Sequence, residues 1–276
     1  MGKAMKESAT FWLAADIGDL ELLKATYIFH TFSRHAHPGF VVGMIERGVE
    51  VFYYRGKIHA ALPGDVVVIN PDEVHTGHSG DAGGWTYRML YPSIATIAQV
   101  AGSINDGPAE MPYFKEAVIK DRPLAMMIKQ LHRVLETSTS VLERQTAFYQ
   151  VMGQLILKHA GNAPAMKKTG TERQAIKKAV VHIHDNIAEN TSLETLSAHV
   201  GLSPFYFARI FRQHTGLPPH AYRKQQRVFQ AKQLLQGRMP IVQVAAEMGF
   251  SDQSHLTRQF KQIFGITPGQ YVSHTG

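Results

Sequence analysis

One pattern occurs twice between residues 196 and 268, and this repeat constrains the fold more than any other feature of the chain. Each copy, over residues 196–219 and 244–268, has a short apolar segment, a glycine, a serine, and a second apolar segment that ends at another glycine. Glycine adopts the backbone angles of a tight turn at no steric cost, and serine is a good N-cap. The repeat therefore predicts two helix-turn-helix units.

The second helix of each unit is predicted to carry the residues that contact DNA. Its apolar residues recur at spacings of three and four, which leaves polar and basic side chains on the opposite face. Such side chains suit base edges and phosphates. The predicted DNA-binding residues are Ser203, Phe205, Tyr206, Ala208, Arg209 and Arg212 in the first copy and Gln253, Ser254, His255, Thr257, Arg258 and Lys261 in the second. The alternative is an ordinary helical bundle whose polar faces are solvated. The second aligned copy of the motif makes this alternative less favoured.

The net charge of +7 is concentrated in the half of the chain that contains the repeat. Residues 1–160 carry 15 Lys and Arg against 16 Asp and Glu, a balance of −1, whereas residues 161–276 carry 14 against 6, a balance of +8. A basic domain next to a neutral one is typical of a protein that binds a polyanion. Many basic surfaces have no role beyond keeping a domain in solution. The charge therefore supports the DNA-binding function that the repeat predicts but does not establish it alone.

Residues 172–276 resemble the DNA-binding domain of the AraC/XylS transcription regulators. The resemblance depends on A-x-x-x-G-F-S-D-Q-S-H-L-T-R-Q-F-K at residues 245–261, G-I-T-P at 265–268, and Y-R-x-x-x-R-V-x-x-A-x-x-L-L at 222–235. It implies two helix-turn-helix units joined by one long helix, which the sequence places at about 219–236. It also implies binding to double-stranded promoter DNA. The residues do not distinguish an activator from a repressor; the resemblance favours an activator, for which RNA polymerase is the expected partner.

The N-terminal half is predicted to form a small β-barrel. Short runs rich in β-branched and aromatic residues alternate with turn residues, as expected for an antiparallel barrel. The expected strands span residues 40–45, 49–54, 57–61, 66–69 and 85–91. The stretches H-A-H-P at 35–38 and P-G-D-V-V-V-I-N-P-D-E-V-H at 63–75 resemble the cupin fold, which AraC-type regulators often carry as an effector sensor. The fold class expected is α+β, with a cupin-like barrel followed by helices and an all-α C-terminal domain.

Three histidines match positions that hold a metal in cupin enzymes: His35, His37 and His75. The carboxylate ligand of that motif falls near Val41 and Val42, which cannot ligate a metal. Three imidazoles are in principle enough for zinc. Without the carboxylate we expect no metal and no other cofactor, and histidines that pack or bind a ligand by hydrogen bonds.

The barrel interior is expected to hold one small effector. The polar residues predicted to line it are His35, His37, Tyr53, His75 and Arg88. An inward Arg88 would need an anionic partner, so an amino acid or an organic acid is the expected effector. A surface arginine or an internal ion pair is the alternative for Arg88.

The predicted domain order is a barrel at 1–110, a helical connector at 111–160, a linker at 161–171 and the DNA-binding domain at 172–276. Residues 94–110 carry no clear pattern and are expected to be mostly loop. Two amphipathic helices are predicted after Pro123. They pack either within the chain or, as the family resemblance implies, against a second subunit in a homodimer.

These observations predict a ligand-responsive transcription regulator rather than an enzyme. The alternatives are a metal-dependent cupin enzyme fused to a DNA-binding domain, and a constitutive DNA binder whose barrel only dimerises. The chain has no cysteine, which excludes disulfides and thiolate chemistry. It has no apolar run of membrane-spanning length and no signal-peptide pattern near its start, so a cytoplasmic location is expected.

Overall fold

The computed structural model describes residues 6–166 and 172–275, and it divides into two compact units. The first comprises Met1–Thr139 and Ala147–Lys167, and the second comprises Ser140–Thr146 and Lys168–Gly276. One boundary between the units, at Lys167/Lys168, lies within the segment 161–171 that the sequence predicts as the linker, whereas Ser140–Thr146, from the predicted connector, belongs to the second unit. Residues 167–171 of that segment lie outside the described residues.

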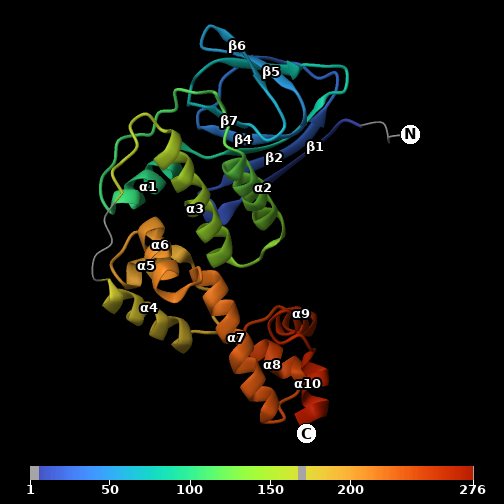
Figure 1. Ribbon diagram of the computed structural model, residues 1–276, viewed down its shortest axis with the longest axis vertical. Helices are drawn as coiled ribbons and strands as arrows, with labels where there is room; N and C mark the ends of the chain where they lie inside the picture. The colour runs from blue at the N-terminus through green and yellow to red at the C-terminus, as the bar shows by residue number, and fades with distance from the viewer. Residues whose placement is uncertain (1–5, 167–171, 276) are drawn as a thin grey trace. The chain divides into compact units, whose positions relative to one another are not determined.

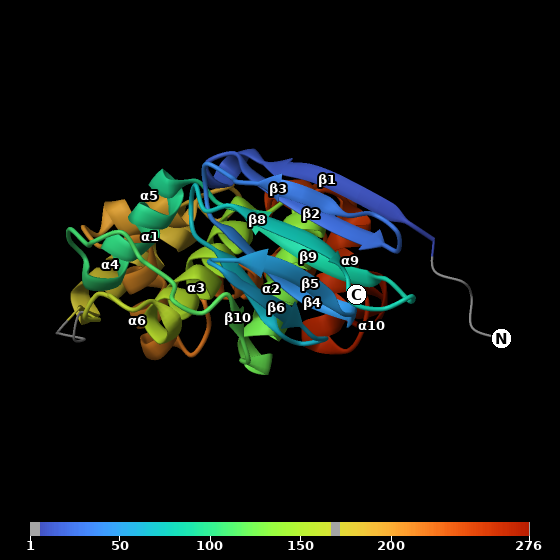
Figure 2. The same cartoon turned by 90° about the horizontal axis from the view of Figure 1, so that it is seen from above.

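Two antiparallel sheets form the N-terminal unit (Figure 1 and Figure 2). The larger sheet has the order β1-β2-β9-β4-β7-β10, and the smaller has the order β3-β8-β5-β6. The strands are β1 Ser8–Ala14, β2 Leu20–Tyr27, β3 Phe32–His35, β4 Val41–Gly48, β5 Glu50–Tyr54, β6 Lys57–Ala61, β7 Val66–Ile69, β8 His75–Ser79, β9 Trp85–Tyr91 and β10 Val118–Ile119. This β-rich, cupin-like sandwich confirms the predicted fold class.

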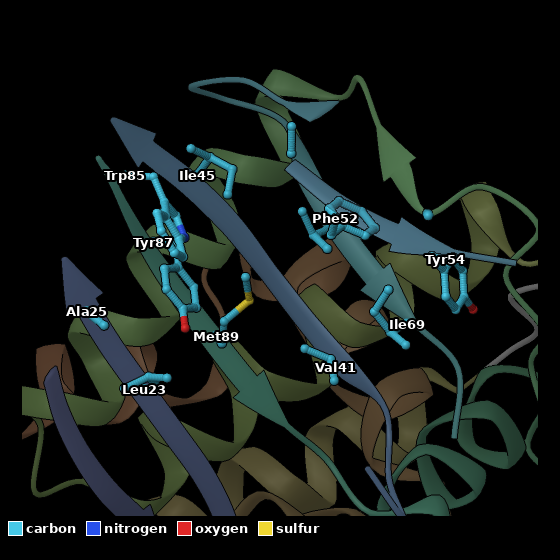
Figure 3. Packing of buried hydrophobic residues seen from close by; sticks show 13 residues of the cluster. Leu23, Ala25, Val41, Ile45, Phe52, Tyr54, Ile69, Trp85, Tyr87 and Met89 are labelled. Carbon is cyan, nitrogen blue, oxygen red and sulfur yellow. The ribbon is translucent and has the colours of Figure 1, made fainter. Parts of the chain in front are cut away.

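The space between the sheets is filled mostly by apolar side chains. Successive residues of a strand point to opposite faces, so each strand contributes every second residue to this core. Figure 3 shows Leu23 from β2, Met89 from β9 and Phe52 from β5 gathered in that space. The residues between them face the other way.

Three helices belong wholly or partly to the N-terminal unit: α1 Ile94–Asn105, α2 Arg122–Thr137 and α3 Val141–His159. The helices α2 and α3 match the predicted amphipathic pair. The loop expected at 94–110 is wrong over most of its length, because α1 occupies it. Ser93 caps α1 by accepting a hydrogen bond from the backbone N–H of Thr96 at 3.1 Å, and buried apolar residues recur at Ile97, Val100 and Ile104.

Helices are the only regular secondary structure among the described residues of the second unit. Its helices are α4 Arg173–Asp185, α5 Leu193–His199, α6 Pro204–Thr215, α7 Pro219–Gln236, α8 Ile241–Glu247, α9 Gln253–Phe264 and α10 Pro268–Thr275. The pairs α5–α6 and α8–α9 are the two helix-turn-helix units, and α7 is the long helix between them (Figure 1). The cap of α9 is Asp252, which accepts from the backbone N–H of His255 at 2.7 Å, so the repeated serine is not the capping side chain there.

Arg227 on α7 connects both halves of this unit through backbone carbonyl groups. Its guanidinium donates to the carbonyl oxygen of Ile187 at 2.7 Å, of Ala188 at 2.9 Å and of Glu189 at 3.1 Å, all in the segment after α4. It also donates to the carbonyl oxygen of Gly249 at 2.9 Å, in the turn between α8 and α9. Burial lowers the pKa of Arg227, although an arginine stays charged at neutral pH.

Gly249 is required at this contact for two reasons. Its φ of +67° is a backbone conformation that glycine adopts without strain. A Cβ atom at this position would also lie 2.3 Å from the carbonyl oxygen of Ala188 and 2.9 Å from Arg227 Nη2. The equivalent Gly201 in the first unit has φ +69°, but a Cβ atom there would meet nothing within 4 Å.

We therefore expect Gly249→Ala to destabilise the protein more than Gly201→Ala. Backbone strain alone costs about 1–2 kcal/mol for a residue in the left-handed region, and both variants bear it. Only Gly249→Ala adds the clash with Ala188 and disturbs Arg227. Chemical denaturation of the two purified variants measures the difference. Equal losses of unfolding free energy would contradict a close contact at Gly249.

Candidate effector cavity and nucleic-acid interface

A cavity of about 240 Å³ lies between the two sheets of the N-terminal unit. Strands of both sheets contribute to its wall, as the alternation of side chains requires. The lining residues are Phe11, Glu21, Leu23, Tyr27, Phe32, His35, His37, Val41, Glu50, Phe52, Val67, Ile69, His75, Thr76, Tyr87, Met89 and Tyr91. Three of the five predicted effector residues, His35, His37 and His75, are among them.

The three histidines form a compact cluster on this wall. His35 and His75 are paired across β3 and β8, and their ring centroids are 4.3 Å apart. The ring of His37 is 5.0 Å from that of His35 and 5.3 Å from that of His75. One ring nitrogen from each residue lies within 4.8 Å of the others.

Backbone carbonyl groups fix the orientation of two of these rings. His35 Nδ1 donates to the carbonyl oxygen of Ser33 at 2.8 Å, and His75 Nδ1 donates to that of Glu73 at 3.1 Å. Because a carbonyl only accepts, Nδ1 carries the proton in each ring, and Nε2 is the acceptor when the ring is neutral. Burial lowers the pKa of His75. Burial, together with His75 and His35, lowers that of His37 to about 4.

Neutral imidazoles held in this way are chemically suited to a transition metal, and a carbonyl partner on the other nitrogen is the usual second contact of a metal-bound histidine. The carboxylate that cupin enzymes add is not part of the cluster, among the described residues. The positions predicted for it, Val41 and Val42, are buried and apolar. The cluster fits a three-nitrogen site and lacks the fourth protein ligand of the enzymes.

Arg88 does not line the cavity, so the prediction that it contacts the effector is wrong. It alternates with Tyr87 and Met89, which do line the cavity, and its side chain lies on the opposite face of the larger sheet. There Arg88 Nε donates to Glu46 Oε1 at 3.1 Å, and Arg88 Nη1 lies 3.4 Å from His132 Nδ1 on α2. The alternative of an internal ion pair is correct, and the argument from Arg88 for an acidic effector falls with it.

Tyr53 is also on the wrong face for a cavity residue. Its side chain is 38% exposed, while its neighbours Phe52 and Tyr54 are buried. On β5, Glu50 alternates in step with Phe52 and Tyr54, so its side chain points to the same inward face. The sequence prediction missed Glu50, although alternation along this strand is a signal that would have found it.

Glu50 is the most perturbed acid of the cavity. Its side chain is buried, and its Oε2 atom has no hydrogen-bond partner. Burial alone raises the pKa of Glu50 from an ordinary value of 4.5 to about 7. Burial raises the pKa values of Tyr87 and Tyr91, and the charge of the nearby Glu50 raises them further. A buried carboxylate that nothing compensates is costly to the fold.

We expect Glu50→Gln to stabilise the protein at pH 8 and to have little effect at pH 4.5. Folding raises the pKa of the Glu50 carboxyl group, so the free energy of unfolding falls as the pH rises from about 4.5 to about 7. A pKa shift of this size corresponds to roughly 3 kcal/mol of unfolding free energy. Urea denaturation at the two pH values measures the difference between wild type and variant. Glu21→Gln, which removes the exposed carboxylate of the same cavity, is the matched control and should change little at either pH.

The second candidate site is the outward face of α6 and α9. Five of the predicted DNA-binding residues are exposed and five are partly exposed. The exposed ones are Arg212, Gln253, Ser254, Arg258 and Lys261, and the partly exposed ones are Ser203, Ala208, Arg209, His255 and Thr257. The face therefore presents cations and hydrogen-bonding groups, as contact with DNA would require.

Phe205 and Tyr206 are core residues, and their prediction as DNA contacts is wrong. Phe205 is 6% exposed and Tyr206 is fully buried. The Tyr206 hydroxyl donates to Glu172 Oε1, and its ring lies 5.2 Å from the Arg209 guanidinium. The Tyr206 ring therefore packs against Arg209 and orients it, and does not itself reach DNA.

No helix among the described residues is both long enough and apolar enough to cross a membrane.

Comparison with known proteins finds a match for each of two domains. The profile of the AraC-like ligand binding domain matches residues 17–152, and that of a helix-turn-helix domain matches residues 196–274. The Uncharacterized HTH-type transcriptional regulator YbfI of Bacillus subtilis (strain 168) is 27% identical over 237 residues, 86% of each chain. The Arabinose operon regulatory protein of Escherichia coli (strain K12) is 26% identical over 252 residues, 84% of this chain and 80% of its own. The HTH-type transcriptional activator RhaS of Pectobacterium carotovorum is 22% identical over 246 residues, 86% of each chain.

Proposed function

This chain belongs to the AraC family of transcription regulators, and from that premise we propose that it binds promoter DNA through α6 and α9 and responds to a small effector in the N-terminal cavity. The observation that carries the proposal is the pairing of two features in one chain. One is a cavity between two sheets, and the other is a pair of helix-turn-helix units with cations on their outward faces.

The two recognition helices read DNA as one rigid unit in this proposal. The helix α7 has 18 residues, so it is about 27 Å long. Arg227 adds a fixed contact between the halves. Two recognition helices on one face of B-DNA enter successive major grooves about 34 Å apart. Arg258 is the residue we expect to read a base, and Lys261 is the one we expect to contact phosphate.

Effector binding and DNA binding are linked by a coupling free energy, typically about 1–3 kcal/mol, or 5–150-fold in affinity. The effector acts only if it binds one state of the regulator more tightly than the other. We propose that the change passes along the helices at 123–160 and the linker, which join the two domains in the chain.

Several finer features of the function are proposals that rest on relatives. An activator that contacts RNA polymerase is favoured because one relative is named a transcriptional activator. A cytoplasmic location follows for a protein that acts on chromosomal DNA. A homodimer through the helices at 123–160 stays as proposed from the sequence.

The family consists of transcription factors and not of enzymes, so the reading as a fused metal-dependent enzyme is set aside. A constitutive DNA binder whose barrel only dimerises is the remaining alternative. The cavity, whose mostly apolar wall also carries histidines and acids, favours the sensor, because a barrel that only dimerises has no need of an interior space.

Arg258→Ala is expected to weaken binding to a specific DNA site by about 1–3 kcal/mol and to relax the preference at one base position. Arg209→Ala should also weaken binding, in part because its stacking on Tyr206 is lost. Lys261→Ala should weaken binding to all sequences alike and flatten the salt dependence by about one unit.

Sites selected from random duplexes, followed by fluorescence anisotropy over a range of salt, measure these effects. Arg238→Ala is the matched control, since Arg238 is an exposed arginine in the turn before α8. Unchanged affinity in both recognition-helix arginine variants would remove the proposed reading surface.

Filling the cavity should abolish the response to an effector. Val67 lines the cavity and is buried, and Val67→Phe places a ring where the effector is proposed to bind. A metabolite panel in a thermal-shift assay should contain compounds that raise the melting temperature of the wild type and not of this variant. A panel in which every stabilising compound acts equally on both proteins would count against the cavity as the effector site.

A further inference from the structure

The cavity wall has acidic groups and no fixed cation, among the described residues that form it. Glu50 and Glu21 line it, while no lysine or arginine does. An anionic effector would therefore meet only repulsion and unpaired carboxylate oxygens in this space.

Glu50 lies against a group of aromatic rings. A Cβ atom on Gly77 would meet Glu50 Oε1 and the Phe32 ring at 3.3 Å each, so the carboxylate and this ring lie over the same point of β8. The Phe32 ring is 5.4 Å from that of Tyr27, and the Tyr27 ring is 6.0 Å from that of Tyr87. A carboxylate next to a group of aromatic rings offers an organic ammonium ion both a counter-ion and ring contacts.

The unpaired Glu50 Oε2 atom is the position at which the positively charged group of a ligand would bind. Its carboxylate is more than nine-tenths buried and lines the cavity without a hydrogen bond to this oxygen. A bound cation would supply the missing partner, and an ionic hydrogen bond is stronger than one between neutral groups. A cavity of about 150 Å³ holds a benzene molecule, so 240 Å³ holds roughly ten non-hydrogen atoms.

We propose that the effector is a small organic cation, an amine or an amidine, whose charged nitrogen binds the Glu50 carboxylate beside the rings of Tyr27, Phe32 and Tyr87. This inference rests on the proposed function, because it assigns the chemistry of the effector in the same cavity. The histidine cluster then presents His35 Nε2 and His75 Nε2 to the N–H groups or hydroxyls of the ligand, because Nδ1 of each ring faces a backbone carbonyl.

Two other occupants suit parts of this wall. A neutral polyol would bind the histidines and tyrosines by hydrogen bonds, but it leaves the charge of Glu50 without a counter-ion. A divalent metal on the three histidines would satisfy the imidazoles, but Glu50 is outside that cluster. Of the three, the organic cation supplies both a counter-ion and a hydrogen-bond donor to the buried carboxylate, and the other two are outcomes that the experiment below distinguishes.

The test compares three probes of nearly the same shape: benzylamine as the cation, benzyl alcohol as the neutral isostere and benzoate as the anion. Isothermal titration of the full chain at pH 8, with a chelator present, gives the dissociation constants. We expect benzylamine to bind at least about tenfold more tightly than benzyl alcohol, as one charge-assisted hydrogen bond implies. Benzoate should bind more weakly than either.

Glu50→Gln should reduce the preference for benzylamine over benzyl alcohol to about twofold or less, since the amide keeps the shape and removes the charge. Glu21→Gln is the control, because Glu21 is exposed and water screens its charge, so the preference should remain. Circular dichroism of both variants checks that the fold is intact.

Several results would overturn the cation assignment. They are no preference for benzylamine in the wild type, tighter binding of benzoate, or an unchanged preference in Glu50→Gln. Tighter binding of a pentose than of benzylamine, lost in Val67→Phe, would replace the cation by a polyol and leave the sensor function standing. Stoichiometric zinc that blocks benzylamine binding would assign the cavity to a metal. The sensor function itself fails only if no compound stabilises the wild type more than Val67→Phe.

Discussion

The alternation of side chains along β5 and β9 determines what the N-terminal unit can bind. On β9, Tyr87 and Met89 face the cavity, while Arg88 between them faces α2 and pairs with Glu46. On β5, Glu50 shares the face of Phe52 and therefore enters the cavity. A shift of one residue in β5 would replace the buried Glu50 by a valine in the wall, and a shift of one residue in β9 would replace Tyr87 or Met89 by Arg88. The chemistry of the sensor thus follows from strand register.

The C-terminal unit depends on a different kind of contact, in which one side chain binds main-chain atoms of both halves. Arg227 recognises four carbonyl groups, in the segment after α4 and at Gly249. Every residue has a backbone carbonyl group, so this contact requires only that the backbone segments lie close to Arg227. At position 249 only glycine permits the close approach, because a Cβ atom would clash with Ala188 and Arg227. The placement of α9 relative to α7, and with it the reading of DNA, depends on this contact.

The sequence predicted the parts of the structure that are periodic or repeated. The two helix-turn-helix units and five of the ten described strands were predictable because turn glycines and apolar spacing mark them, and the three histidines because of their spacing. Arg88, Tyr53, Phe205 and Tyr206 were misplaced, since the face a residue occupies depends on register and packing that one sequence does not reveal. Glu50 was missed for a different reason: a glutamate in a strand is usually exposed, so its alternation with Phe52 and Tyr54 was not interpreted as an inward position.

The most direct test of the central claim measures the affinity of the full chain for its selected DNA site with and without a cavity ligand, in the wild type and in Val67→Phe. The ligand is any compound that stabilises the wild type and not the variant. If the cavity controls DNA binding, the ligand changes the dissociation constant of the wild type by at least about fivefold and leaves that of the variant unchanged. An identical dissociation constant with and without ligand in the wild type would contradict the account, because the two sites would then not be coupled.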